Sequence, residues 1–549
     1  MPTPPRAILA THEVTNQPPD FAGRNLYLTD TALREAAERE GGAAVRQPLA
    51  VLGSVAGSEQ VLQWGADANR FPPELMTFDR YGRRLDEVRF HPAYHALMAL
   101  AMQHGIHSVA WSDPGPGSHV LHAAMLAVFT QAEAGVMCPI SMTYASVPAL
   151  RHQPDIAATW EPKILSRDYD ATLRPISAKS AVTLGMAMTE KQGGSDVRAN
   201  TTRAFPLDGG RRGFRLVGHK WFCSAPMSDA FLTLAYTDAG LSCFLVPRVL
   251  PDGERNRLYI MRLKDKLGNR SNASSEIEYH DTYAELIGEE GRGVQTIIEM
   301  VNHTRLDTMA GALGIMRRAL AEAVHHVSHR SAFQKRLIDQ PLMREVLADI
   351  ALDYEAAAAL AMRVARAFGG ETAQERAFAR LAVAVGKFWI TKRTPHFVYE
   401  CLECLGGGGY VEEGPMARLY REAPLNAIWE GSGNVIALDI MRTLHKEPLA
   451  GEALRAELAL ANGADQRLDA EIAGIDDALG SRLGEADARH LAERVALTLS
   501  SALLVRHAPR AVADAHCAAR LGARWSSTYG AGSACGDTDA ILERQLAAS

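Results

Sequence analysis

Apolar residues recur at helical spacing over two long regions of the chain, about 30–180 and 291–445. The clearest examples are HPAYHALMALAMQHGI, which starts at His91, and TRLDTMAGALGIMRRALAEAVHHVSHR, which starts at Thr304. The first 30 residues or so are rich in Pro, Thr and Asn and predict an extended arm. The last stretch, 446–549, is rich in Ala, Leu, Arg and Glu and again predicts helices.

Between the two helical regions, from about 182 to 290, short β-rich runs are separated by Gly, Pro and Asp. They include FRLVGHKWFCS, AFLTLAY, LSCFLVP, NRLYIMRL and SSEIEYH. This pattern predicts a small barrel or sandwich. Because helices and strands are segregated rather than alternating, we expect an α+β multidomain protein and not a doubly wound sheet. The predicted domains are 1–181, 182–290, 291–445 and 446–549.

Composition narrows the class of protein. The 549 residues include 58 Lys and Arg against 64 Asp and Glu, a net charge of −6, which excludes a uniformly basic nucleic-acid binder but not a local basic patch. Seven cysteines are too few for a disulfide scaffold, so we expect a reducing, cytoplasmic compartment. The N-terminus does not read as a secretory signal, and no apolar run reaches the ~18 residues of a membrane span.

The segment GMAMTEKQGGSDV, from Gly185 to Val197, is the most informative motif. A Gly-Gly pair lets backbone amides approach an anion, Ser195 adds a hydroxyl donor, and Thr189 could reach a ring carbonyl or nitrogen. Taken alone, such a segment is more often an ordinary turn. It is neither a dinucleotide fingerprint nor a P-loop.

Two aromatic residues and a hydroxyl, Trp221, Phe222 and Ser224, follow on a predicted strand, where a flat ring could stack. An ordinary core strand is the alternative. Further on, an aromatic-Glu-Gly-Ser-Gly-Asn turn precedes a new helix and carries Glu430. The glycines let the chain bend sharply and present this carboxylate, and the helix start could bind phosphate. A solvated loop is the alternative here.

RSAFQKRLIDQ (330–340) and CLECLGGGGY (401–410) both suit backbone contact with a dinucleotide. Together, the order and spacing of all these segments over 182–445 resemble the acyl-CoA dehydrogenase superfamily, near its isovaleryl-CoA dehydrogenases and closest to its adaptive-response branch. The resemblance extends to NLYLTD (25–30), GRRLDEVRFHP (82–92), GLSCFLVPR (240–248) and LKDKLGNRSNAS (263–274).

The resemblance implies an N-terminal helical domain, a central β domain, a C-terminal helical bundle and an extra C-terminal helical domain. It also implies FAD, a homotetramer, an unknown electron acceptor and, for the adaptive-response branch, association with duplex DNA in the alkylation-damage response together with weak dehydrogenase activity.

The family's cofactor contacts map onto three groups of residues here. The β domain would contribute Met186, Met188, Thr189, Gly194, Ser195, Phe222, Cys223 and Ser224. The loop around Glu430 would contribute Ile428, Trp429, Gly431, Ser432 and Asn434. A neighbouring subunit would contribute Arg330, Phe333, Gln340, Gly406 and Gly407. The chain departs from the family at Gln334, where Gly is usual, and at Glu403, where Gln is frequent.

The implied reaction is α,β-dehydrogenation of a short or branched acyl-CoA thioester, with slow turnover. An α-proton beside a thioester is weakly acidic, so a positioned carboxylate is needed, and Glu430 is the candidate. Its backbone N–H and a ribityl hydroxyl would polarise the thioester carbonyl. The isovaleryl branch places its base before an Arg one helix earlier. That position is Thr304 here, before Arg305, and Thr cannot act as the base. A nitroalkane-oxidising reading would require Asp rather than Glu430.

DNA association without sequence specificity is the competing function, that of a protective flavoprotein with no physiological dehydrogenase activity. Residues 446–549 carry 11 basic and 15 acidic side chains, which disfavours phosphate binding by the whole region. Residues 494–530, however, contain five arginines and only one aspartate. The spacing predicts that two pairs of them share helix faces. A salt-bridged helix face is the alternative. The five are Arg494, Arg506, Arg510, Arg520 and Arg524.

Two other groups of residues are expected to be structural. Cys401 and Cys404 form a lone pair that lacks further zinc ligands. His325, His326 and His329 share a helix without a Glu between them or a clear third ligand. No metal site is therefore predicted.

Overall fold

The computed structural model describes residues 3–207, 212–480, 484–523, 526–532 and 536–546. Asp30 begins the first helix, where its side chain accepts the Leu33 N–H at 3.1 Å, a regular N-cap. Within the described ranges, no helix is both long and apolar enough to span a bilayer. The N-terminal helices are α1 (Thr31–Gly41), α2 (Arg46–Ala56), α3 (Glu59–Arg70), α4 (Pro92–Gln103), α5 (Val109–Ser112), α6 (Ser118–Thr130), α7 (Met137–Leu150) and α8 (Pro154–Ile164).

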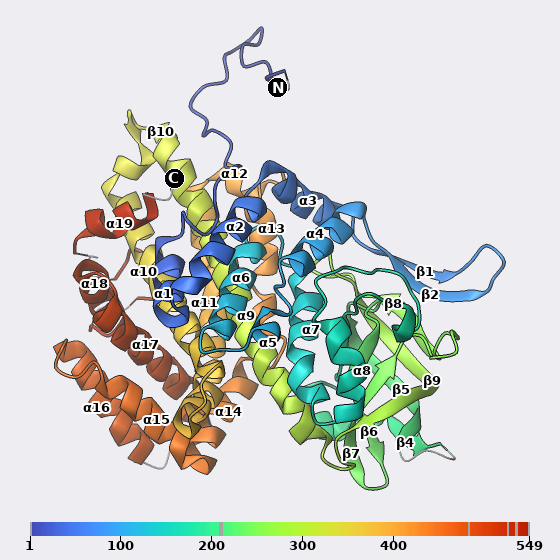
Figure 1. Ribbon diagram of the computed structural model, residues 1–549. Helices are drawn as coiled ribbons and strands as arrows, with labels where there is room; N and C mark the ends of the chain where they lie inside the picture. Colours follow the sequence, from blue (N-terminus) through green and yellow to red (C-terminus); the bar gives the residue numbers. More distant parts are fainter. Residues whose placement is uncertain (1–2, 208–211, 481–483, 524–525, 533–535, 547–549) are drawn as a thin grey trace.

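A β-hairpin interrupts these helices, where the sequence predicts mostly helix. Strands β1 (Glu74–Phe78) and β2 (Arg84–Arg89) pair antiparallel and project from the body of the molecule (Figure 1). The turn between them is stabilised locally, because the Asp79 carboxylate accepts the N–H groups of Tyr81 and Arg83 at 2.8 and 2.9 Å. The helical periodicity on either side conceals this short polar turn.

The central strands close into a barrel. Neighbouring strands run in the ring β4–β5–β9–β7–β6 and back to β4, with β3 paired to β6 and β8 paired to β9. The predicted fold class is thus confirmed. Of the two alternatives that the sequence left open for this domain, the structure shows the barrel and not the sandwich. The strands are β3 (Leu184–Ala187), β4 (Arg203–Pro206), β5 (Gly213–Ser224), β6 (Ala230–Thr237), β7 (Gly240–Pro247), β8 (Leu258–Leu263) and β9 (Ser274–Ile287).

A buried ion pair holds the loop that follows β3 against the barrel. Lys220 Nζ lies 2.9 Å from Glu190 Oε1 and also donates to the Leu234 carbonyl at 2.9 Å. The same carboxylate accepts the hydroxyl and N–H groups of Thr201 and Thr202. Burial opposes ionisation, but Lys220 and Thr202 keep the pKa of Glu190 below its usual value. Glu190, just before the Gly-Gly-Ser-Asp turn, is therefore held in place by these contacts.

Three long helices and one shorter helix form the bundle. Helix α9 (Gly293–His329) runs out, α10 (Pro341–Phe368) returns, and α11 (Ala373–Cys404) runs out again, with α14 (Gly433–Lys446) packed on α11. A small hairpin of β10 (Ser331–Ala332) and β11 (Lys335–Arg336) caps α9, and α12 (Gly407–Tyr410) and α13 (Met416–Glu422) follow α11. One-turn 3₁₀ segments are η1 (Ala43–Val45), η2 (Ile176–Ala178), η3 (Val197–Ala199), η4 (Leu337–Asp339), η5 (Leu425–Ala427) and η6 (Glu485–Asp487).

The C-terminal helices lie along the bundle rather than apart from it, as the orange-to-red ribbon of Figure 1 shows. Helix α17 packs on α10, α11 and α14, and α19 packs on α10. Buried charges tie the two parts, since Arg520 bonds Asp353 at 2.8 Å and Arg363 bonds Glu457 at 2.8 Å. The helices are α15 (Pro448–Ala459), α16 (Gln466–Gly480), α17 (Ala488–His507), α18 (Arg510–Arg520) and α19 (Thr538–Leu546).

Glu422 at the end of α13 joins the bundle to the barrel and should make stability depend on pH. Its carboxyl group accepts the Asn269 N–H at 2.7 Å, and burial together with Glu133 raises its pKa to about 7. A carboxyl group with a raised pKa in the folded state stabilises that state only while protonated. Its contribution is therefore lost as the pH rises from about 4.5 to 7.

We expect Glu422→Gln, which keeps the acceptor but not the charge, to be more stable than wild type at pH 8 by about 1 to 3 kcal/mol. Thermal unfolding midpoints between pH 5 and 8 measure this, with the exposed Glu413→Gln as the matched control. A difference that does not shrink toward pH 5 would contradict this explanation.

Candidate active site

The loop from Ile428 to Ser432 carries Glu430 in an uncommon backbone conformation. Glu430 has φ +57° and Gly431 has φ +103°, so two successive residues lie in the left-handed region. Glycine is favoured at 431 because an L side chain is strained at this φ, and a Cβ there would also come within 2.8 Å of Ile436 Cδ1. The turn thus ends η5, presents the Glu430 side chain and starts α14 at Gly433.

Helices α9 and α11 hold this loop from two sides. Thr304 on α9 donates its hydroxyl to Glu430 Oε2 at 2.8 Å, and Arg305 Nε donates to the Glu430 carbonyl at 3.2 Å. Lys387 on α11 donates its ammonium to the Gly431 carbonyl. Thr304 occupies the position where the resemblance places the base of the isovaleryl branch. In this chain its hydroxyl orients the Glu430 carboxylate instead.

Asp439 on α14 locks the same helices together. Its two carboxylate oxygens each lie 2.8 Å from an arginine, Arg305 of α9 and Arg380 of α11. Burial opposes ionisation of Asp439, but the two guanidinium groups keep its pKa below the usual value. Since α14 begins immediately after the loop, this pairing fixes the position from which Glu430 is presented.

The electrostatic surroundings of Glu430 suit a proton acceptor. Burial raises the pKa of its carboxyl group, and Asp307 adds to this, while Thr304, Lys387 and Arg305 oppose it. Burial also lowers the pKa of Lys387 to about 7, with Glu430 opposing that shift. A carboxylate whose pKa is raised is a stronger base than one in water.

Two predicted contacts from the β domain pack against the same hydrophobic cluster as Trp429 of this loop. Met186 and Met188 flank the end of β3 and, like Trp429, pack half-buried against one common hydrophobic cluster. Trp429 donates its indole N–H to Asn426 at 2.9 Å. Thr189 is joined to β5 through its carbonyl, which accepts the Trp221 N–H at 2.8 Å. The structure therefore brings part of the β-domain set together with the Glu430 loop.

Strand β5 separates the three residues predicted to contact the flavin. Phe222 is half exposed and Ser224 is half-buried, whereas the Cys223 side chain between them is fully buried. Successive side chains on a strand point to opposite faces, so the Cys223 thiol lies in the barrel interior. Burial there raises its pKa to about 12. The Cys223 side chain is thus covered by the barrel, so a contact between this residue and a cofactor would involve its backbone, and that contact stays a prediction.

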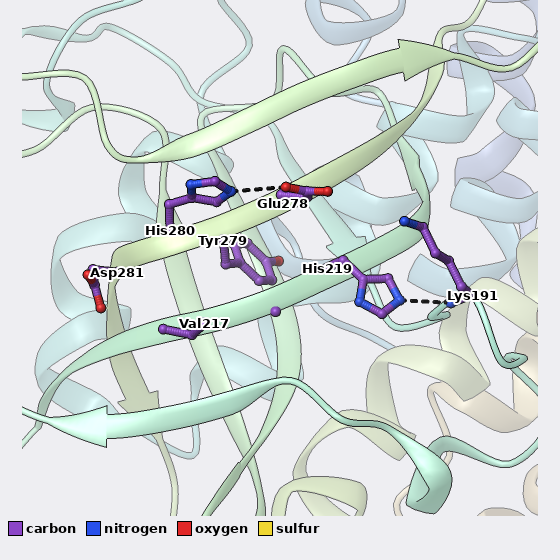
Figure 2. A pocket seen from close by; sticks show the side chains of 8 residues that line it. Lys191, Val217, His219, Glu278, Tyr279, His280 and Asp281 are labelled. Atoms are coloured by element: carbon purple, nitrogen blue, oxygen red, sulfur yellow. Dashed lines mark hydrogen bonds and ion pairs between the residues drawn. The ribbon is translucent and has the colours of Figure 1, made fainter.

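The Gly-Gly-Ser-Asp turn is open to solvent at Ser195 but closely packed at Gly194, where a Cβ would lie 2.3 Å from Thr189 Oγ1. Behind the turn, Lys191 donates its N–H to His219 Nε2 at 3.0 Å. Figure 2 shows this contact at the edge of a cavity of about 460 Å³ on the outer surface of β5 and β9. Glu430 does not line this cavity. The hydrogen bond between Lys191 and His219 anchors the turn from the outer side of the barrel.

The remaining predicted contacts lie at the other end of the bundle. At about 1.5 Å per residue, the helix between Thr304 and Arg330 is about 39 Å long. Phe333 follows in a turn with positive φ and is 94% exposed. Gly406 and Gly407 lie at the same end, beyond α11, with open space in front of both. Arg330, Phe333, Gln340, Gly406 and Gly407 are thus not brought to Glu430 within one chain.

At the start of α14 the predicted residues are exposed. Ile428 and Ser432 face solvent, and the Asn434 amide oxygen accepts the guanidinium of Arg489 at 3.0 Å. Helix α17 of the C-terminal extension thus reaches the loop that bears Glu430. Sequence reasoning missed Arg489, Lys387, Arg380 and Asp439. Only Lys387 carried a usable signal, a single charge inside the apolar run AVAVGKFWI.

The arginines predicted to contact DNA do not form one surface. Arg506 lies in the last turn of α17 and Arg510 begins α18, because Pro509 cannot continue a helix. These two arginines therefore do not share a helix face as predicted. Arg520 is 5% exposed and pairs with Asp349 and Asp353. Arg494 pairs with Glu471 and Arg506 with Glu457. Arg510 is exposed, and Arg524 lies outside the described residues. The salt-bridged alternative describes this region better.

Comparisons with known proteins agree with the geometry. Residues 16–171 match the adaptive response protein AidB N-terminal domain, 185–282 the acyl-CoA dehydrogenase middle domain, and 291–445 the acyl-CoA dehydrogenase C-terminal domain. AidB of Escherichia coli (strain K12) is 45% identical over 94% of this chain and 95% of its own length. The chain belongs to the acyl-CoA dehydrogenase family.

Within that family the chain is AidB-like. It is 31% identical to acyl-CoA dehydrogenase family member 11 of Caenorhabditis elegans over 82% of this chain and 78% of the relative. The solved structure of C. elegans ACDH-11 in complex with C11-CoA superposes with a TM-score of 0.83, at 28% identity, over 99% of this chain and 98% of the other.

Members of this family depend on FAD, and the residues present fit that cofactor. Phe222, Ile428 and Phe333 are large apolar side chains left in water in the single chain. A planar ring system or a neighbouring subunit would cover such side chains. Thr189, Ser195 and Ser224 add hydroxyl groups beside the half-exposed Phe222 and the Gly-Gly turn. Cofactor contacts with these residues remain a prediction.

Thr304 should tune the basicity of Glu430. Its hydroxyl stabilises the ionised carboxylate, so we expect Thr304→Val to raise the Glu430 pKa further, by about one to two units for a hydrogen bond to a charged group. Since only the ionised form accepts a proton, the rising limb of the rate of flavin reduction should move to higher pH by the same amount. Anaerobic stopped-flow measurements from pH 5 to 10 test this.

The matched control is Thr308→Val, one turn along α9, whose hydroxyl bonds the Arg305 carbonyl instead. An equal shift in both variants would mean that altered helix packing, and not the lost hydrogen bond, is responsible.

Proposed function

We propose that the chain is an FAD-dependent oxidoreductase that removes hydrogen from the Cα–Cβ bond of short or branched acyl-CoA thioesters, with Glu430 as the base. The observation that carries this proposal is the Glu430 carboxylate itself. It is presented by a left-handed turn, oriented by Thr304 and made more basic by burial. Bound FAD supplies the acceptor for the β-hydride.

In this proposal the chain's own residues handle the proton and the carbonyl group. Glu430 accepts the α-proton at a carboxylate oxygen while Thr304 holds that carboxylate in place. The Glu430 N–H lies in the same turn and would donate to the thioester oxygen, which lowers the cost of enolate formation. Lys387 and Arg305 clamp the backbone carbonyls of Gly431 and Glu430, so the turn keeps its shape when the charge changes.

Aromatic packing next to the base supports a short acyl group and slow turnover. His303, adjacent to Thr304, lies 5.3 Å from the Trp111 ring and 5.0 Å from the Phe368 ring. Tyr144 stacks on Trp111 at 5.4 Å. These rings pack around the residue that precedes Thr304, and in this proposal they shorten the space left for an acyl chain. The C. elegans relative solved with C11-CoA supports a thioester as the ligand class.

The far end of the bundle supports an assembly in which subunits share cofactor sites. Arg330 and Phe333 cannot reach Glu430 within one chain, and the Arg330 guanidinium is positioned by the Asn16 carbonyl at 2.9 Å. We propose that the β10–β11 hairpin of one subunit covers FAD bound by another, in a homotetramer. Its exposed Phe333 is then buried by the assembly.

The Glu430→Gln variant tests the proposed chemistry. It should bind FAD like wild type, because the amide keeps an acceptor for Thr304, but lose reduction of the flavin by acyl-CoA at least 10³-fold. The measurement is anaerobic loss of oxidised flavin absorbance with a panel of short and branched acyl-CoA thioesters. Wild-type protein that stays oxidised with every thioester would overturn the proposal, as would a Gln variant that is still reduced.

Phe333→Ser tests the shared site. We expect it to retain several-fold less FAD after gel filtration, because an apolar wall of the cofactor site is lost. The measurement is the ratio of flavin to protein absorbance, together with the mass of the particle in solution. Leu460→Ser, an exposed apolar position on the C-terminal extension, is the control. Unchanged FAD retention in Phe333→Ser would exclude the cross-subunit role.

A further inference from the structure

A small cavity at the base of the projecting β1–β2 hairpin has an unusual lining. Its volume is about 170 Å³, and it lies between β2 and the barrel segment that runs from the end of β7 into β8. No residue of the Glu430 loop lines it. The side chains that matter here are Arg84, Asp86, Arg248, Arg255, Arg257 and Tyr259.

Four guanidinium groups therefore surround the cavity against one carboxylate. Arg84 is paired with Asp86, Nε to Oδ2 at 2.7 Å, and Arg255 is paired with Glu87 from outside the lining. Arg248 and Arg257 have no carboxylate within ion-pair distance in the described part of the chain. The cavity thus has an excess of about two positive charges.

Arg248 is the buried member of this set, at 5% exposure. Its guanidinium donates to backbone carbonyls, those of Pro226 and Asp86, and not to a carboxylate. Burial lowers the pKa of Arg248, with Asp86 opposing this. A buried cation that is satisfied only by neutral carbonyls is costly. An anion in the adjoining cavity would offset that cost.

Arg257 forms the exposed rim, and its guanidinium has no hydrogen-bond partner among the described residues. Its backbone is nevertheless fixed, because the buried Asn256 side chain accepts the N–H groups of Arg257 and Tyr283 at 2.9 and 3.0 Å. Arg84 lies over the Tyr259 ring at 4.7 Å. Arg84 and the Arg257 backbone are thus held in place before any ligand arrives, while the Arg257 guanidinium is free to bind one.

We propose that this cavity binds a phosphate group. A guanidinium group can donate two parallel hydrogen bonds to two oxygens of one phosphate group. Arg248 and Arg257, which have no carboxylate partner among the described residues, would make the stronger contacts. Arg84 and Arg255, which are already paired with carboxylates, would help to orient the phosphate. The volume is below the roughly 300 to 1,000 Å³ of pockets that enclose drug-sized ligands. A phosphate group therefore enters alone, either as the free ion or as part of a larger molecule whose remainder stays outside.

The test uses full-length, FAD-loaded protein, so that the cofactor site cannot take up the probe. Calorimetric titration with inorganic phosphate in a low-chloride buffer should show one saturable site per chain. Arg257→Ala should weaken binding at least tenfold and Arg257→Glu should abolish it, whereas Arg203→Ala, an exposed arginine on β4, should bind like wild type. Arg248→Met is a second variant, and the exposed Arg257 keeps the test valid if Arg248→Met does not fold.

Methyl phosphate and dimethyl phosphate distinguish the sources. Binding of inorganic and methyl phosphate alone supports a free or terminal phosphate, and binding of dimethyl phosphate as well supports a phosphodiester. Absence of saturable phosphate binding by the wild type would overturn the proposal. An Arg257→Glu variant that binds phosphate as tightly as wild type would also overturn it, since the phosphate would then occupy another site.

Discussion

The Glu430 carboxyl group is buried and is also held in a single orientation, and the contacts that do both connect several helices of the molecule. Burial raises the pKa of the carboxyl group, so each surrounding contact has to orient it without restoring full solvation. Thr304 does this with one hydroxyl, whereas Arg305 and Lys387 direct their hydrogen bonds to backbone carbonyls and reach the carboxylate only through their charge. The left-handed turn at Glu430 and Gly431 persists because these contacts and the packing around Gly431 over-determine it.

The same need for rigidity explains the charged networks between the helices. Asp439 bridges Arg305 and Arg380, and Asp353 bridges Arg393 and Arg520, so carboxylates join helices that a purely apolar interface would leave free to slide. Buried pairs of this kind add little net stability, but removing one partner leaves an unpaired charge. The C-terminal extension is thereby fixed to the bundle, and its Arg489 reaches the start of α14. Its arginines serve mainly in these contacts, which is why they do not form a basic surface.

Some predictions made from residue spacing were wrong because the arrangement of the helices and strands separates residues that are close in sequence. The spacing of Arg506 and Arg510 indicated one helix face, but Pro509 places them on two helices. The β1–β2 hairpin was hidden between helical patterns, since its turn depends on a single carboxylate, that of Asp79. By contrast, the order of helical, β and helical regions followed directly from hydrophobic periodicity, because periodicity reports which face of each element is buried.

The sequence by itself determined the order of helical and β regions, since hydrophobic periodicity is a local property of the chain. The family and Glu430 as the candidate base came from the resemblance of its motifs to the acyl-CoA dehydrogenases. Only the tertiary structure decided which residues surround that base. Lys387, Arg380 and Asp439 are separated from Glu430 along the chain or lie on other helices, and no local pattern encodes their approach. The structure also shows α9 unbroken from Thr304 to its end, which places Arg330 about 39 Å from Thr304 and Phe333 in the hairpin beyond it. Contacts made across elements depend on packing, and packing is settled by the whole chain at once.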